Sequence, residues 1–157
     1  VGLAKRLRIP DDYFTLSQSL AYQYYNLNNY YTGLFPFGDG SSNNLSYTVA
    51  LSRNNTFTNP IFPLGGSEFV LSARFSLPYS LWNGVDYANL GDLEKFQDDD
   101  GNPDPAKIEQ EKFKWLEFYK IKFKGSWYTR LFDKLVLRTH TEFGFLGAFN
   151  NLSLIHI

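Results

Sequence analysis

His140 is the residue of this chain best suited to acid–base chemistry, because a histidine titrates near neutral pH. Arg138 and Glu142 flank it at a spacing of two residues, so the three side chains share one side of an extended strand. Such a trio supplies the groups of general acid–base catalysis, but it equally suits a charged wall in water, which we favour. The other histidine, His156, is distant in sequence. We therefore predict no catalytic residue, no enzyme activity and no cofactor.

A run of oxygen-bearing side chains resembles part of a calcium loop and consists of Asp98, Asp100, Gly101, Asn102 and Asp104. A calcium loop of the EF-hand type needs glycine at position 6 and glutamate at position 12, and no register of this run supplies both. Pro103 and Pro105 favour a turn-rich segment. We interpret the run as a solvated loop and predict no metal site.

Three lysines, Lys120, Lys122 and Lys124, alternate with apolar residues. A stripe of cations could select anions or bind a polypeptide, but more often it keeps one strand face in water and pairs with carboxylates of neighbouring strands. The glycines form no phosphate loop, since no Gly-x-x-x-x-Gly-Lys-Ser/Thr occurs. The charge is nearly balanced, with 15 basic and 16 acidic residues, so nucleic acid is not an expected partner.

Composition narrows the class of protein further. The chain has no cysteine, which excludes disulfides and thiolate metal sites. Aromatic residues make up 18%, with 15 Phe and 11 Tyr, as suits aromatic belts at membrane interfaces. No apolar run is long enough for a transmembrane helix. The chain opens on Val1 without a visible signal peptide, as expected of a mature or truncated chain.

The elements that position these residues are predicted by alternation with a period of two, which indicates β-strands. About six strands are predicted, near residues 1–9, 14–24, 45–52, 69–75, 119–127 and 135–145. Most approach the length of about 10 residues that crosses a bilayer as a tilted strand. The one candidate helix lies within residues 105–118. Short connections, at residues 10–12 and 124–134, alternate with longer ones, as is typical of outer-membrane barrels.

The two faces of the strands distinguish a soluble sandwich from a membrane barrel. A small soluble barrel fills its interior with mostly apolar side chains, whereas here one face is charged. We expect that face to line a water-filled lumen; it carries Arg74, Lys120, Lys122, Lys124, Arg138, His140 and Glu142. We expect the opposite face to meet lipid; it carries Phe14, Leu16, Leu20, Tyr22, Tyr47, Val49, Leu51, Phe69, Leu71, Ile121, Phe123, Leu137 and Phe143.

The predicted fold is therefore all-β: an antiparallel membrane β-barrel fragment of about six strands with meander topology. Six strands are too few to close, since the smallest spanning barrels have about eight. An open edge in lipid leaves unpaired backbone groups, each costing several kcal/mol. On this interpretation further strands complete the barrel.

Several segments resemble the barrel of the BamA family of outer-membrane assembly factors. Ser52-Arg53-Asn54, followed by Asn59-Pro60-Ile61-Phe62-Pro63-Leu64-Gly65-Gly66-Ser67, is similar to the family's strand–turn–strand with a Phe-Pro-x-x-Gly turn. Pro10-Asp11-Asp12-Tyr13-Phe14 resembles its tight periplasmic turn, and residues 115–122 and 135–147 resemble two further strands. The similarity covers roughly residues 1–150. The given sequence does not contain the family's POTRA domains, its Arg-Gly-aromatic loop tip or its gate strands. Residues 152–157 are interpreted as a non-native tail.

The resemblance implies that residues 1–157 belong to a partial C-terminal transmembrane β-barrel domain, with its sixth to eleventh strands of sixteen. It implies that the parent protein folds and inserts other outer-membrane proteins. The expected location is the bacterial outer membrane. Expected partners are the lipid bilayer, nascent outer-membrane proteins and accessory assembly lipoproteins. The alternatives are a TamA-like factor, a two-partner secretion transporter, a porin-type channel and a soluble β-sandwich.

Overall fold

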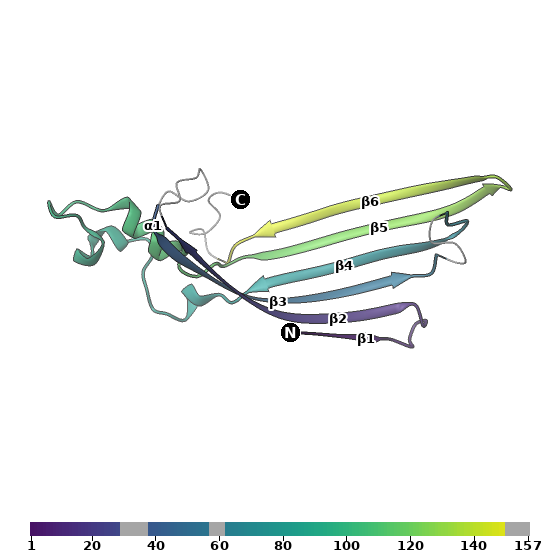
Figure 1. The fold of residues 1–157 in the computed structure, drawn as a ribbon, viewed down its shortest axis with the longest axis horizontal. Coiled ribbons are helices and arrows are strands. Elements are labelled where there is room, and N and C mark those ends of the chain that lie inside the picture. Colours follow the sequence, from purple (N-terminus) through teal and green to yellow (C-terminus); the bar gives the residue numbers. More distant parts are fainter. Residues whose placement is uncertain (29–37, 57–61, 150–157) are drawn as a thin grey trace. The chain divides into compact units, whose positions relative to one another are not determined.

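The computed structural model describes residues 1–28, 38–56 and 62–149. Six antiparallel strands form one meander sheet, in which each strand pairs with its neighbours in chain order (Figure 1). The strands are β1 (Gly2–Arg6), β2 (Phe14–Leu27), β3 (Gly40–Asn54), β4 (Gly66–Ser76), β5 (Tyr119–Phe132) and β6 (Leu135–Gly147). The predicted all-β class and meander topology are confirmed, and the sheet of the described residues is not closed.

The strands differ in extent from the sequence prediction, most clearly β1, β3 and β5. Strand β3 begins at Gly40, before the predicted start at residue 45. The connection predicted at 124–134 is strand over most of its length, because β5 continues to Phe132 and only Asp133 and Lys134 form the turn to β6. Gly125 interrupts the apolar alternation, although the backbone stays extended through it. In contrast, β1 is shorter than predicted and ends at Arg6. The proposed non-native tail at 152–157 lies outside the described residues.

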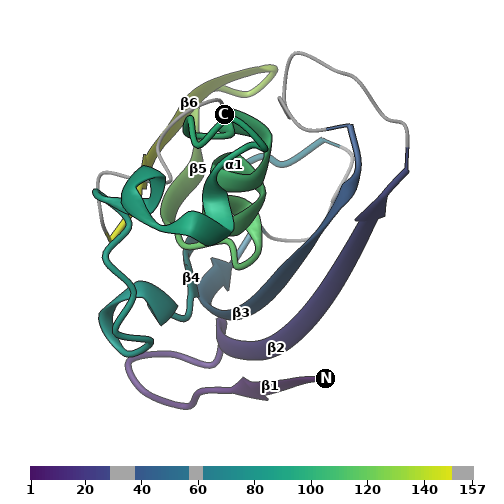
Figure 2. The ribbon, with the colours of Figure 1, turned by 90° about the vertical axis from the view of Figure 1, so that its left-hand side faces the viewer.

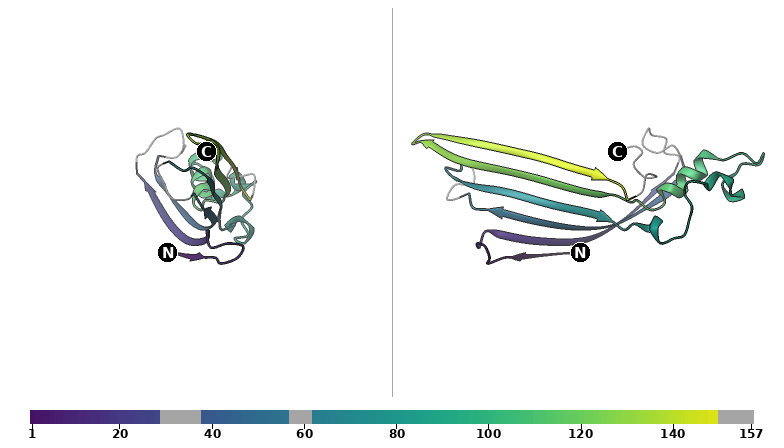
Figure 3. Two further views of the ribbon diagram at one scale, coloured as in Figure 1. Left: turned by 90° about the vertical axis from the view of Figure 1, so that its right-hand side faces the viewer. Right: turned by 180° about the vertical axis from the view of Figure 1, so that it is seen from behind.

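The described residues divide into two compact units. Unit 1 comprises Val1–Leu20, Tyr47–Arg74 and Lys120–Leu146. Unit 2 comprises Ala21–Ser46, Phe75–Tyr119 and Gly147–Ile157. In unit 1, the turns from β1 to β2 and from β5 to β6 lie at the same end of the sheet (Figure 3).

The long connection between β4 and β5 belongs to unit 2 and contains the helical structure of the described residues (Figure 2). It forms three 3-10 turns, η1 (Tyr79–Leu81), η2 (Leu90–Asp92) and η3 (Glu94–Phe96), followed by α1 (Pro105–Phe113). Asp104 caps α1 by accepting hydrogen bonds from the main-chain N–H groups of residues 106 and 107, which satisfies donors that a helix start leaves free. No helix in the described ranges has the length and apolar character of a membrane span.

The hydrophobic core lies in this connection and not against the sheet. The buried hydrophobic residues of the described chain are Leu90, Phe96 and Phe113, which are 1%, 5% and 7% exposed. All three belong to the segment that we call the cap, residues 86–113. The buried residues of the strands are instead small or polar: Ser42, Asn44, Ser46, Ser67, Ser76, Gly125, Ser126 and Gly147. The large apolar side chains of the sheet are half-buried or exposed, so no apolar layer of the described residues covers them.

Candidate functional site

One face of the sheet carries a row of aromatic rings, which lies in unit 1. Phe14 of β2 meets Phe69 of β4 edge-on, with ring centroids 5.8 Å apart. Phe69 stacks on Phe123 of β5 at 6.2 Å, and Phe123 stacks on Phe143 of β6 at 5.1 Å. We call the face that these four rings share the apolar face. By alternation along the strands it also carries the other residues predicted to meet lipid: Leu16, Leu20, Tyr22, Tyr47, Val49, Leu51, Leu71, Ile121 and Leu137.

Two pairs of polar side chains on β2 and β3 are hydrogen-bonded to each other on this side of the strands. Gln18, which breaks the apolar alternation of β2, accepts a 2.7 Å hydrogen bond from the Tyr47 hydroxyl. In unit 2, the Tyr22 hydroxyl donates to Asn43 Oδ1 at 2.7 Å. An unpaired polar group costs about 1–3 kcal/mol in an apolar medium. These pairs therefore let the face meet such a medium at lower cost.

At the short-turn end of unit 1, Arg53 places a cation on the apolar face, where the Asp11 carboxylate neutralises its charge. Its guanidinium donates to Asp11 Oδ2 at 2.8 and 3.0 Å and to Ser67 Oγ at 2.9 Å. It also lies over the rings of Tyr13 and Phe14, 5.9 and 5.6 Å from their centroids. Such geometry permits a cation–π attraction. The ion pair joins the first turn to the end of β3, and the hydrogen bond to Ser67 adds the start of β4.

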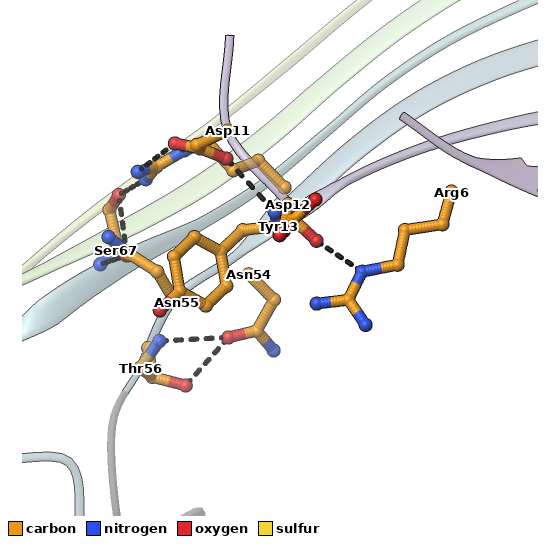
Figure 4. A network of polar contacts seen from close by, with 9 residues as sticks. Arg6, Asp11, Asp12, Tyr13, Asn54, Asn55, Thr56 and Ser67 are labelled. Atoms are coloured by element: carbon orange, nitrogen blue, oxygen red, sulfur yellow. Dashed lines mark hydrogen bonds and ion pairs between the residues drawn. The ribbon is translucent and has the colours of Figure 1, made fainter. Parts of the chain in front are cut away.

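The same cluster joins the end of β3 and the residues just after it to the start of β4 (Figure 4). Asn55 and Ser67 exchange main-chain and side-chain hydrogen bonds, with Ser67 N–H donating to Asn55 Oδ1 at 2.7 Å. Asn54 Oδ1 accepts from the Thr56 hydroxyl at 2.7 Å. Gly66 has φ +95°, and a Cβ there would collide with the Asn55 carbonyl oxygen. Glycine is therefore the residue that this turn requires.

The opposite face of unit 1, the polar face, brings together four of the seven residues predicted to line a lumen. Lys122 Nζ lies 2.6 Å from Glu142 Oε1, and His140 Nε2 lies 3.8 Å from the other oxygen of Glu142. Ser126 Oγ lies 2.9 Å from His140 Nδ1 and accepts from Arg138 at 3.2 Å. By alternation, Arg74, Lys120 and Lys124 share this face.

Sequence reasoning missed the neutral members of this polar ladder, although their parity along the strands could have indicated them. Ser126 is buried between Arg138 and His140. Tyr128 lies beneath the Arg138 guanidinium, 5.7 Å away, and its hydroxyl lies 3.4 Å from Glu68. The ladder runs across β4, β5 and β6 as alternating charges and hydroxyls. Because its members pair with one another across strands, the arrangement stabilises a hydrated wall.

The acidic run resembling a calcium loop is organised by its own backbone. Asp98 Oδ1 accepts hydrogen bonds from the N–H groups of Asp100 and Asn102, at 3.0 and 2.8 Å, and Gly101 adopts φ +81°. Partial burial raises the pKa of Asp104, but the helix N–H groups and Lys107 outweigh it and lower that pKa. Within the described ranges, no three His, Cys, Asp or Glu side chains gather as metal ligands.

In unit 2, the segment after the cap completes the edge of β3 beyond the end of β4. Asn43 N–H donates to Lys114 O, and Leu116 N–H donates to Asn43 O, both at 2.9 Å. These bonds form a parallel bridge between Asn43 and Trp115. Tyr79 lies against Trp115 with ring centroids 4.2 Å apart. Burial raises the pKa of the Tyr79 hydroxyl, and the nearby Tyr22 and Glu117 raise it further.

Asp11 gives the short-turn cluster a testable pH dependence. Partial burial alone raises the pKa of Asp11, but hydrogen bonds from Arg53 and Tyr13 and the Arg53 charge hold it below its ordinary value of 3.8. The carboxylate therefore stabilises the fold above that pH, and the contribution is lost as the pH falls through the folded-state pKa. We expect Asp11→Asn to unfold at lower urea than wild type at neutral pH, with the gap closing below pH 3.8.

The matched control is Asp12→Asn, because Asp12 meets Arg6 through its main-chain oxygen and should tolerate loss of its carboxylate. Urea unfolding of the three proteins between neutral and acidic pH measures the effect. A gap between Asp11→Asn and wild type that keeps its size at every pH would contradict the Arg53–Asp11 ion pair.

Comparison of the chain with protein families, with curated proteins and with solved structures finds no match. The features of the described residues that bear on function are the apolar and polar faces of the sheet, the short-turn cluster around Arg53 and the cap.

Proposed function

We propose that this sheet is part of the wall of a transmembrane β-barrel in the bacterial outer membrane. The observation that supports this most is the placement of apolar side chains. The buried hydrophobic residues of the described chain lie in the cap, while the large side chains of the apolar face are half-buried or exposed among the described residues. A contiguous apolar surface of this kind is unfavourable in water and marks an interaction site. Lipid would cover the apolar face, and water would fill the polar side.

The extent of the apolar face along β3 suits a bilayer. It is bounded by polar pairs, at Asn43 near one end and at Arg53 near the other. These positions are separated by 53 − 43 = 10 residues, which rise about 33 Å in a strand. A tilt of about 40° projects this to about 25 Å, the height of the apolar band of outer-membrane barrels.

The open sheet supports a wall that other strands complete. Among the described residues, β1 and β6 each have one neighbouring strand. A free strand edge in lipid leaves N–H and C=O groups without partners, at several kcal/mol each. We infer that in the complete barrel each of these edges pairs with a further strand.

The resemblance to the BamA family supports a finer proposal, that the complete barrel folds and inserts other outer-membrane proteins. A nascent strand in lipid needs a template for its backbone hydrogen bonds, and a sheet edge offers one. In this proposal the partners are the lipid bilayer, nascent outer-membrane proteins and accessory assembly lipoproteins. The strands of this chain form supporting wall, and the proposal requires no catalytic residue or cofactor.

A porin-type channel is the second candidate, and the charged polar face favours it. Lys122, Arg138, His140 and Glu142 are polar-face groups that a water-filled pore would hydrate. A TamA-like factor or a two-partner secretion transporter would use the same wall for a related task.

Two adjacent residues at the middle of β4 test the membrane assignment. Val70 and Leu71 are 42% and 43% exposed and project to opposite faces. If lipid covers the apolar face, Leu71→Lys destabilises the complete barrel by about 2–4 kcal/mol at mid-bilayer depth. Val70→Lys faces water and changes stability by less than about 0.5 kcal/mol. Urea unfolding in lipid vesicles measures both.

Because the two side chains are equally exposed, a sheet surrounded by water would respond similarly to both substitutions. Equal effects of Leu71→Lys and Val70→Lys would therefore reject the transmembrane wall.

Reconstitution of the complete barrel separates assembly factor from channel. We expect vesicles that contain it to speed insertion of an unfolded outer-membrane protein by about tenfold or more, as a barrier reduction of about 1.4 kcal/mol requires. Protease protection of the inserted client measures the rate, and vesicles that hold an unrelated barrel are the control. Steady ion conductance without faster insertion would favour the channel.

A further inference from the structure

The connection between β4 and β5 is sharply divided in charge. Residues 77–85 contain no charged side chain, whereas residues 86–117 contain ten acidic and four basic ones. The first part, Leu77-Pro78-Tyr79-Ser80-Leu81-Trp82-Asn83-Gly84-Val85, directly follows β4. We call it the uncharged segment. In a loop surrounded by water, charged side chains are expected along the whole length, so the uncharged part indicates a different environment.

The uncharged segment exposes three of its apolar side chains. Leu81 and Trp82 are 66% and 68% exposed, and Leu77 is also exposed. Leu81 ends η1, and Trp82 follows directly. The cap buries Leu90, Phe96 and Phe113 in its own core and exposes Leu93. The core of the cap therefore does not include the exposed side chains of the uncharged segment.

Hydrogen bonds hold the uncharged segment in place. Leu77 N–H donates to Leu45 O of β3 at 3.3 Å. The Ser80 hydroxyl donates to Glu117 Oε2 at 2.7 Å, and Ser80 N–H donates to the other oxygen of the same buried carboxylate. The segment is thus anchored just before η1, at Leu77, and within η1, at Ser80, while Leu81 and Trp82 remain exposed.

The anchored segment begins on the apolar face of unit 2. Asn43 lies on this face, because its Oδ1 accepts from Tyr22. Residues paired in a β-bridge project to the same side of a sheet, so Trp115, the bridge partner of Asn43, lies there too. Tyr79 packs on the Trp115 ring. The ring of Tyr79 therefore lies with Trp115 on the side of unit 2 that carries Tyr22 and Asn43.

We propose that the uncharged segment lies in the headgroup region of the same bilayer, with Leu81 and Trp82 as its lipid anchors. This inference rests on the proposed transmembrane wall. Tryptophan and tyrosine favour the membrane–water interface, because their rings are apolar and their N–H and O–H groups reach water. The negatively charged cap stays in the aqueous phase. The connection thus has one lipid-bound part and one exposed part.

Tryptophan fluorescence in vesicles tests the anchor directly. The complete barrel is reconstituted in phosphatidylcholine whose acyl chains are brominated either near the headgroup or near the chain end. The difference between the wild-type and Trp82→Phe spectra gives the emission of Trp82. The difference between the wild-type and Trp127→Phe spectra gives that of Trp127, which lies on the apolar face by alternation along β5. We expect shallow bromines to quench about half or more of the Trp82 emission, and deep bromines much less.

Trp127 distinguishes failure of the anchor from failure of the wall. Lipid quenching of Trp127 with unquenched Trp82 emission would overturn the anchor and leave the transmembrane wall standing. If bromines quench neither residue, the wall and the anchor both fail. Because Trp82 is exposed and phenylalanine keeps an aromatic ring, the Trp82→Phe barrel should fold as wild type does.

Discussion

Hydrogen bonding between neighbouring strands is the interaction on which the rest of this structure depends, because the residues that the structure describes form no buried apolar layer on the sheet. A soluble sheet is normally held by packing one apolar face against another layer. Here the large side chains of the apolar face remain half-buried or exposed, and the buried strand residues are serines, glycines and an asparagine. Backbone pairing of this kind is most favourable where water cannot compete for N–H and C=O groups. The proposed lipid environment follows from that requirement.

The other features accommodate this constraint. Polar groups that fall on the apolar face are paired locally, as Gln18 is with Tyr47 and Arg53 is with Asp11. The polar face carries cross-strand pairs such as Lys122–Glu142, which water can hydrate. The cap forms a separate core around Leu90, Phe96 and Phe113. The buried hydrophobic residues of the described chain therefore come from this connection and not from the strands.

Much of the fold could be predicted from sequence, because alternation with a period of two is a local signal. It indicated six strands and placed Phe14, Phe69, Phe123 and Phe143 on one face. The full extent of β5 was missed because cross-strand pairing carries the strand past Gly125, where local propensity fails. Asp104 followed by Pro105 is a recognisable helix start, yet the cap core depends on contacts between residues distant in sequence. Burial of Ser42, Asn44 and Ser46 left no signal in the pattern, because such residues usually indicate solvent.

In the proposed barrel, opposite faces of one sheet meet lipid and water. Spin labels placed along β5 report these two environments directly. This chain has no cysteine, so labels can be introduced singly at successive positions from Tyr119 to Phe132 in the vesicle-bound barrel. If the apolar face meets lipid, labels at Ile121 and Phe123 should be the most accessible to oxygen, which dissolves in lipid. Accessibility to a water-soluble nickel complex should peak at Lys122 and Lys124, in opposite phase. If the accessibilities of the labels to oxygen and to the nickel complex rise and fall together along β5, the two faces do not meet different media, and the transmembrane wall is rejected.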